Sequence, residues 1–331
     1  MTPPLHLKIR NIKPCKHFPG IRPFSDRLVM LIIGLYFVGG IAVAADFCTQ
    51  TANAAFKACQ HEVKDDFWIS MGNCTNLSDP NIRAGCEALA VAVLGEDLQL
   101  CREQLEARLE VCRLLGEARY DPQIDPGNFV NPTQIGSTVS PNPYFPLIMG
   151  TTRTYRGGGQ ITTVSVTKST KTILGVTCVV VRDIVQENGQ TIEDTEDWFA
   201  QDVQGNVWYF GEISQEFNNG ELVSLEGSWK AGVDGAKPGI VMKSFPQIGN
   251  VYRQEFALGG AEDLAQVLSL TESTTVPAAS CNGNCLVTRD FTPIEPGAEE
   301  NKYYAPGIGP ILEIDLETRE RVELIDIKMN P

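Results

Sequence analysis

The spacing of apolar and polar positions changes along the chain, and each spacing predicts a different structure. Residues 28–45 form an apolar run, residues 46–118 carry apolar and cysteine positions at helical spacing, and proline-rich residues 119–146 follow. Residues 147–331 hold short β-branched and aromatic runs separated by Gly and Asn turns. We therefore expect an α+β chain, in which a six-cysteine α-hairpin and a linker precede an antiparallel β domain that is either barrel-like or a sandwich meander.

Residues 1–45 have the features of an export signal. Basic side chains precede the apolar run 28–45, which ends in the small-residue pattern Ala42-Val43-Ala44. This order is typical of a signal peptide cleaved after Ala44 or Ala45. An uncleaved membrane segment is the alternative, because the run is at the short end of a spanning helix. In both cases we expect an exported protein, periplasmic or extracellular, that meets a membrane only through residues 28–45.

The charge of the chain excludes one class of partner. Residues 1–44 hold six of the 27 Lys and Arg and one of the 41 Asp and Glu, which leaves 21 basic against 40 acidic residues and a net charge of −19. A body this acidic repels phosphate backbones and anionic lipid. We expect no nucleic acid, and we expect an unidentified ligand or protein partner.

The cysteines of residues 46–118 predict a disulfide framework. Their spacings are 11, 15, 12, 15 and 11 residues, which is a palindrome centred on Pro80. Two antiparallel helical arms in register would pair cysteines at equal distances from such a centre, with Asp79 as the N-cap of the second helix. A zinc site is disfavoured, because zinc-binding pairs are usually two to four residues apart. The predicted bonds are nested, and a small loop bond is expected in the β domain: Cys48–Cys112, Cys59–Cys101, Cys74–Cys86 and Cys281–Cys285.

The stretch from Glu193 to Glu212 predicts a central β-hairpin with two apolar faces. Alternation places Trp198, Trp208 and Phe210 on one face, and Phe199, Val207 and Tyr209 on the other. At the open end, Glu196 or Asp197 faces Glu212, depending on the register. Two carboxyls that meet need water, a cation or a shared proton between them.

Residues 147–331 contain no histidine, so carboxylates are the candidate chemistry of the β domain. Glu196, Asp197 and Glu212, joined by nearby acids of residues 255–263, could act as an acid–base pair or as oxygen ligands of Ca²⁺. Apart from Ca²⁺, no cofactor is expected. The simpler interpretation is that these acids end strands and face water. A ligand-binding surface is the other candidate, and its predicted residues are Trp198, Trp208, Tyr209, Glu212 and Glu255.

Several motifs of the β domain resemble those of a family of exported bacterial proteins of unknown function. They are NPYFPL with GTTRTYRGGG, EDTEDWFAQD with GNVWYFGE, GSWKAGVDGAKPGIVM, YRQEF with AEDLA, and RDFTPIEPG with KYYAPGIG. The resemblance implies export and no particular activity. Our leading hypothesis is therefore a non-enzymatic binding or interaction protein of the cell envelope, and the alternative is a carboxylate-dependent hydrolase or lyase.

Overall fold

The computed structural model describes residues 46–329. The predicted signal peptide or membrane segment therefore lies outside the described residues. Among the helices of residues 46–329, none has the length and apolar character needed to cross a bilayer.

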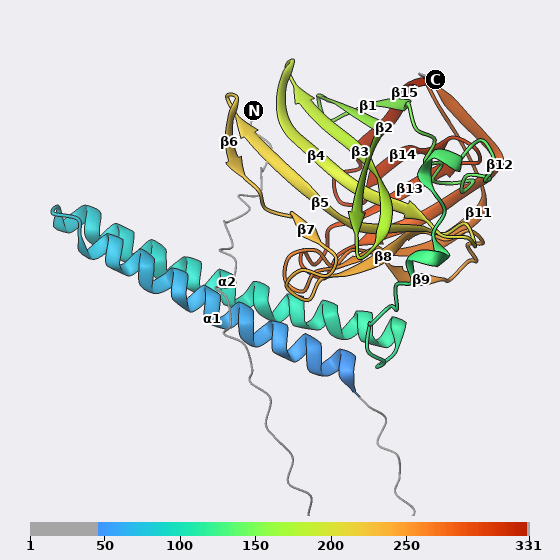
Figure 1. Cartoon of the computed structure of the whole chain (residues 1–331). Coiled ribbons are helices and arrows are strands. Elements are labelled where there is room, and N and C mark those ends of the chain that lie inside the picture. Colours follow the sequence, from blue (N-terminus) through green and yellow to red (C-terminus); the bar gives the residue numbers. More distant parts are fainter. Residues whose placement is uncertain (1–45, 330–331) are drawn as a thin grey trace, which may run out of the picture. The chain divides into compact units, whose positions relative to one another are not determined.

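Two long helices form the predicted α-hairpin (Figure 1). Helix α1 (Phe47–Thr75) and helix α2 (Pro80–Leu115) run antiparallel. Asp79 caps α2, since its side chain accepts hydrogen bonds from the backbone N–H groups of Asn81 and Ile82. The nested pairing is confirmed, and so is the small loop bond: Cys48–Cys112, Cys59–Cys101, Cys74–Cys86 and Cys281–Cys285.

The proline-rich segment that follows packs along the β domain, with two 3₁₀ turns, η1 (Pro126–Asn128) and η2 (Pro132–Gln134). The backbone N–H of Asn142 donates to Gln201 Oε1 at 2.9 Å, and its side chain donates to the carbonyl oxygen of Gly205 at 2.8 Å. Polar groups of the segment thus find partners on the loops between strands, as buried backbone requires.

The β domain is one antiparallel sheet that curves into a barrel (Figure 1). Its order is β10-β8-β5-β4-β3-β2-β1-β15-β14-β13-β12-β11-β9, with β6 and β7 paired to β5. The strands are β1 (Thr151–Gly157), β2 (Gln160–Ile173), β3 (Val176–Glu187), β4 (Gln190–Gln201), β5 (Val207–Asn218), β6 (Glu221–Ser224), β7 (Trp229–Lys230), β8 (Lys237–Met242), β9 (Val251–Arg253), β10 (Glu255–Phe256), β11 (Leu264–Val276), β12 (Ala279–Phe291), β13 (Glu299–Ala305), β14 (Gly309–Asp315) and β15 (Arg321–Met329).

The short β9 and β10 connect the two ends of this sheet. β9 pairs with β11, and β10, one residue further along the chain, pairs with β8. Close approach at this junction requires Gly239, because a Cβ there would lie 2.3 Å from the backbone of Gln254. The barrel-like form of the expected fold is therefore the one observed.

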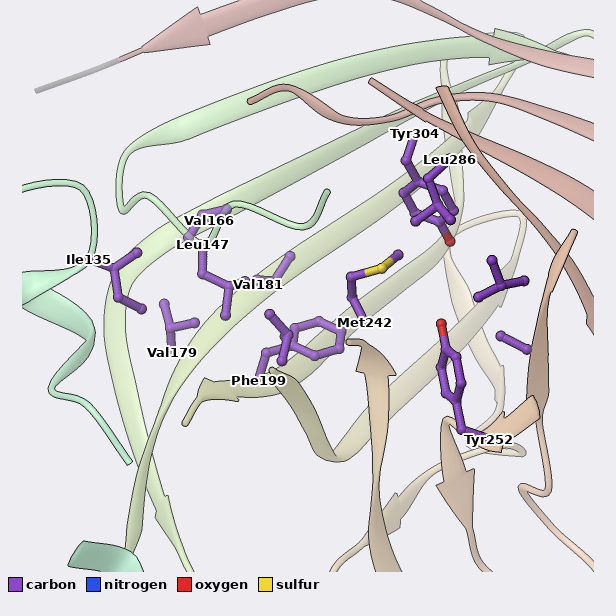
Figure 2. Close-up of a cluster of buried hydrophobic side chains, with 13 residues drawn as sticks. Ile135, Leu147, Val166, Val179, Val181, Phe199, Met242, Tyr252, Leu286 and Tyr304 are labelled. Carbon is purple, nitrogen blue, oxygen red and sulfur yellow. The ribbon is translucent and has the colours of Figure 1, made fainter. Parts of the chain in front are cut away.

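The two faces of the sheet have separate cores. An inner cluster includes Val181, Phe199, Met242 and Leu286 (Figure 2). These residues come from strands on different sides of the barrel, and because their side chains pack together, the cluster fills the barrel interior. An outer cluster, with Trp198 and Phe210 among its members, is covered in part by Ile124 and Phe129 of the linker. The predicted division of the hairpin's aromatic residues between two faces is confirmed.

A buried ion pair joins the α-hairpin to the barrel. Arg108 of α2 donates to Glu262 from both Nε and Nη2, at 2.7–3.1 Å, and the two side chains are 6% and 2% exposed. Glu262 also accepts from the backbone N–H of Gly259 at 2.8 Å. Glu262 therefore serves the junction with the helices, and it does not join the other candidate acids.

Candidate functional site

The barrel interior is apolar in one part and strongly acidic in another. Side chains alternate between the two faces of a strand. Asp183 of β3 therefore lies on the same inward face as Val179 and Val181, and Asp197 of β4 lies on the same inward face as Phe199. The same alternation brings acids from strands on the opposite side of the barrel to this end. The lumen acids are Asp183, Asp197, Glu212, Glu255, Asp290, Glu300 and Glu313, and the exposed Asp263 precedes β11 beside them.

A β-bulge in β5 sets the register of the first acids. Phe199 pairs with Tyr209, whereas Asp197 pairs with Glu212, so β5 holds one extra residue between these positions. Gly211 allows the bulge, with φ +128 and a hypothetical Cβ only 2.3 Å from the carbonyl oxygen of Trp229. Of the two registers expected from the sequence, the one that joins Asp197 to Glu212 is observed.

Asp183, Asp197, Glu212 and Glu255 form what we call the Asp197 cluster; the exposed Asp263, on which the charge of Lys302 acts, is not counted in it. The hydroxyl of Tyr209 donates to Asp197 Oδ1 at 2.6 Å. Burial, opposed by this hydrogen bond, raises the pKa of Asp197 to about 7. Burial together with the charge of Asp197 raises the pKa of Glu212 to about 8 and that of Asp183 to about 8.

The remaining acid of this cluster, Glu255, lies in β10. Burial and the neighbouring charges of Asp263 and Glu212 raise the pKa of Glu255 well above its ordinary value. Within residues 46–329, no Lys or Arg forms an ion pair with any member of the Asp197 cluster. Burial and the neighbouring negative charges therefore favour the protonated form of these carboxyls, as their raised pKa values express.

The second group of acids, which we call the Lys302 cluster, surrounds an ammonium group. Nζ of Lys302 lies 2.6 Å from Glu300, 3.5 Å from Asp290 and 3.8 Å from Glu313. Burial lowers the pKa of Lys302, but the three carboxylates outweigh it and raise that pKa well above the ordinary value. Burial raises the pKa of Glu313 to about 8, even though Lys302 opposes the shift.

The lumen residues lie deep in the molecule and still meet solvent. Burial dominates the pKa shifts of Glu313 and Asp183, yet both side chains keep accessible surface. The exposed fractions of the Lys302, Glu300 and Glu313 side chains are 29%, 30% and 39%. These acids and Lys302 are therefore partly accessible to water, although burial dominates the pKa shifts of the acids.

Two polar groups bordering the acids have no hydrogen-bond partner. The hydroxyl of Tyr252 and the indole N–H of Trp229 are both buried and unpaired, although each residue is only 7% exposed. Figure 2 shows the hydroxyl ends of Tyr252 and Tyr304 pointing toward each other. Burial is the main cause of the raised pKa of both tyrosines, and the charge of Asp290 is the next. Buried polar groups of this kind are normally satisfied, so their presence here suggests a polar ligand or ordered water.

The structure separates the predicted ligand-binding residues into two groups. Tyr209, Glu212 and Glu255 belong to the lumen. Trp198 lies in the outer core, and the indole N–H of Trp208 donates to Asp202 at 2.9 Å beside the linker residue Phe129. Of the candidate catalytic acids, Asp197 and Glu212 meet, whereas Glu196 lies on the exposed outer side of β4.

Lys302 and its acids were not found from the sequence. Glu300-Asn301-Lys302 does carry a signal, since an acid and a lysine at alternate strand positions share a face. The pairing of β13 with β12 and β14 decides which of its faces points inward. The local sequence pattern does not determine this pairing. For a metal site, no group of three His, Cys, Asp or Glu side chains in the described part of the chain is arranged to hold an ion.

A hollow of about 390 Å³ lies between α2 and the β12–β13 loop. Val111, Leu114 and Phe291 contribute to its lining. Its basic residue, Arg289, is already paired with Glu299, at 2.7 Å from Nε. This groove therefore has apolar surface and compensated charge, unlike the lumen.

Comparisons with known proteins give no family. No family model matches the chain, and no curated protein is recognisably similar to it. The chain is similar to a solved structure of a "putative lipoprotein" from Parabacteroides distasonis ATCC 8503, with 12% sequence identity over 57% of this chain and 100% of that one. The TM-score is 0.31, and a likeness of this size carries no argument about fold or function.

Proposed function

We propose that this chain is an exported, non-enzymatic binding protein that holds a ligand with a positively charged group in its barrel lumen. The observation that carries the proposal is the Asp197 cluster itself, because no Lys or Arg of the described residues forms an ion pair with its carboxyls. A cation is the complement of these carboxyls, because a nearby positive charge stabilises their ionised form. The −19 net charge of residues 45–331 adds a field that attracts such ligands.

Export is supported by the disulfides. Three of them staple the α-hairpin and one closes a loop of β12, and bonds of this kind persist in oxidising compartments. The predicted signal at residues 28–45 agrees with a periplasmic or extracellular location, at the cell envelope. The hairpin has no enclosed interior of its own, so we assign ligand binding to the barrel.

Thermal unfolding in the presence of small probes tests the proposal. We expect n-butylammonium or tetramethylammonium to raise the melting temperature at pH 8, while n-butanol and butyrate at equal ionic strength leave it unchanged. A ligand at one hundred times its Kd stabilises the folded state by about 2.7 kcal/mol, which is readily measured. Equal shifts with cations and with butyrate, or no shift with any cation, would contradict the proposal.

A carboxylate-dependent hydrolase or lyase is the second candidate. The pairing of Asp197 with Glu212 favours it, because the two carboxyls are held close together and the pKa of each is raised toward neutrality. A turnover that Glu212→Gln abolishes, while binding of the same substrate persists, would establish an enzyme. Binding without turnover over a panel of glycosides and esters would favour the binding protein.

A further inference from the structure

We infer that the Asp197 cluster recognises a primary ammonium, the group that ends a lysine side chain or a free alkylamine. This inference rests on the proposed function and narrows its ligand class. The lumen itself contains the pattern for such a site, because it already holds one primary ammonium of its own.

Lys302 shows how this lumen binds an ammonium. The Nζ group lies within 4 Å of carboxylates from three neighbouring strands, Asp290 of β12, Glu300 of β13 and Glu313 of β14. Three acceptors match the three N–H donors of an ammonium. A strand-borne ring of carboxylates is thus the chemistry by which this fold compensates a buried amine.

The Asp197 cluster offers the same acceptors from the strands across the barrel. Asp183, Asp197 and Glu212 come from the consecutive strands β3, β4 and β5, and Glu255 of β10 interacts with Glu212. Tyr209 fixes Asp197 by its 2.6 Å hydrogen bond, which leaves the second carboxylate oxygen for another donor. In the Lys302 cluster an ammonium from the chain fills this role, whereas the Asp197 cluster has no such side chain among the described residues.

Two unpaired polar groups of the lumen support a polar ligand. Tyr252 is 7% exposed, its hydroxyl has no hydrogen-bond partner and points toward the hydroxyl of Tyr304 (Figure 2), and the charge of Asp290 acts on it. It can accept a hydrogen bond from an ammonium. The indole N–H of Trp229 lies near the carboxyl of Glu255 and lowers its pKa, but no acceptor meets it in hydrogen-bond geometry.

The surroundings favour a primary ammonium over other cations. Quaternary ammonium groups bind against open aromatic faces. Here Tyr209 is stacked on Phe199 with ring centroids 4.6 Å apart, and it meets Trp229 edge-on at 5.3 Å. Ca²⁺ needs six to eight converging oxygens, and no group of three acids in residues 46–329 is arranged to hold a metal.

Calorimetric titration of the disulfide-bonded chain at pH 8 tests the inference. We expect n-butylammonium to bind at least tenfold more tightly than tetramethylammonium or Ca²⁺. Equal affinity for butylammonium and tetramethylammonium would overturn the inference and leave the proposed function standing. Absence of binding by any cation would overturn both.

Two further arms identify the source of the ammonium and the residues that bind it. Tighter binding of Nα-acetyl-lysine amide than of 1,5-diaminopentane would assign a lysine side chain as the ligand group, and the reverse order would assign a free diamine. Glu212→Gln is expected to weaken binding at least tenfold, while Glu221→Gln, an exposed residue of β6, leaves it unchanged. Equal affinity of wild type and Glu212→Gln would overturn the assignment.

A measurement on the unmodified chain keeps the inference testable if Glu212→Gln fails to fold. Because the pKa values of these carboxyls are raised, an ammonium that stabilises their ionised form releases protons, and titrations at pH 7 in buffers of different ionisation enthalpy are expected to show this release on binding. Binding of butylammonium without release would overturn the inference.

Discussion

Replacing Lys302 with alanine removes the ammonium from the Lys302 cluster and leaves its carboxylates without their cation. Breaking a fully buried ion pair in this way costs about 3–5 kcal/mol. Because the Lys302 side chain keeps 29% of its surface exposed, solvent screens the charges and we expect a loss of about 2–3 kcal/mol. For a chain of this size, that loss lowers the melting temperature by roughly 5 °C.

The assay is thermal unfolding followed by circular dichroism at pH 8 and at pH 4. The loss is expected to be larger at pH 8, where more of these acids carry charge than at pH 4. It shrinks at pH 4, because protonated carboxyls no longer need the ammonium. The matched control is Lys328→Ala, whose side chain is 69% exposed and pairs with Asp326 at 3.2 Å, and it is expected to cost under about 0.5 kcal/mol.

Adding n-butylammonium to the Lys302→Ala variant extends the experiment. The truncated side chain leaves room for the alkyl group, so the free amine is expected to restore part of the lost stability. A melting temperature within one degree of wild type at both pH values would refute the reasoning, since it would mean that Lys302 contributes nothing to holding the acids together.

Three other outcomes are expected. Asp197→Asn should stabilise the chain by about 1–2 kcal/mol at pH 9 and not at pH 4. The pKa of the Asp197 carboxyl rises to about 7 on folding, so the folded state binds more protons than the unfolded state. The stability of the wild type therefore falls as pH rises from about 4 through 7. Equal free energies of unfolding for the wild type and Asp197→Asn at pH 9 would contradict this prediction. Arg108→Ala should cost about 3–5 kcal/mol, because it leaves Glu262 buried without its partner, and urea unfolding compared with Arg102→Ala would detect it. Intact mass of the chain without residues 1–45 should rise by eight hydrogens on reduction, and one thiol, Cys178, should react with alkylating reagent only after unfolding; early reaction would contradict its burial.

The parts of this structure that were predictable depend on local or symmetric patterns. The nested disulfides follow from the equal spacing of cysteines about Pro80, and the cap at Asp79 follows from its position before that proline. The meeting of Asp197 with Glu212 was anticipated because one hairpin carries both, although the choice between registers depended on Gly211 and its bulge. Short-range physics, namely side-chain alternation and turn chemistry, was sufficient for these features.

The full set of lumen acids could not be predicted from the sequence, because it depends on contacts between distant parts of the chain. The charge of Glu313 contributes, after burial and nearer acids, to the raised pKa of Asp183, although 130 positions of chain separate the two residues. Their approach depends on the closure of the barrel through β9 and β10, which are only three and two residues long and give little periodic pattern. The outward placement of Trp198 likewise depends on the linker, whose packing against the outer face leaves no repeating pattern in the sequence.

The pairing of β1 with β15 has a consequence for how the chain is made. Thr151 lies opposite Met329, so the strand that starts the barrel is completed only by the strand that ends it. During synthesis or passage through a membrane, the α-hairpin can form all its bonds early, whereas the barrel stays open until the last residues emerge. A product that stops before Arg321 would keep the edge of β1 uncovered, and an uncovered edge can recruit strands from other molecules.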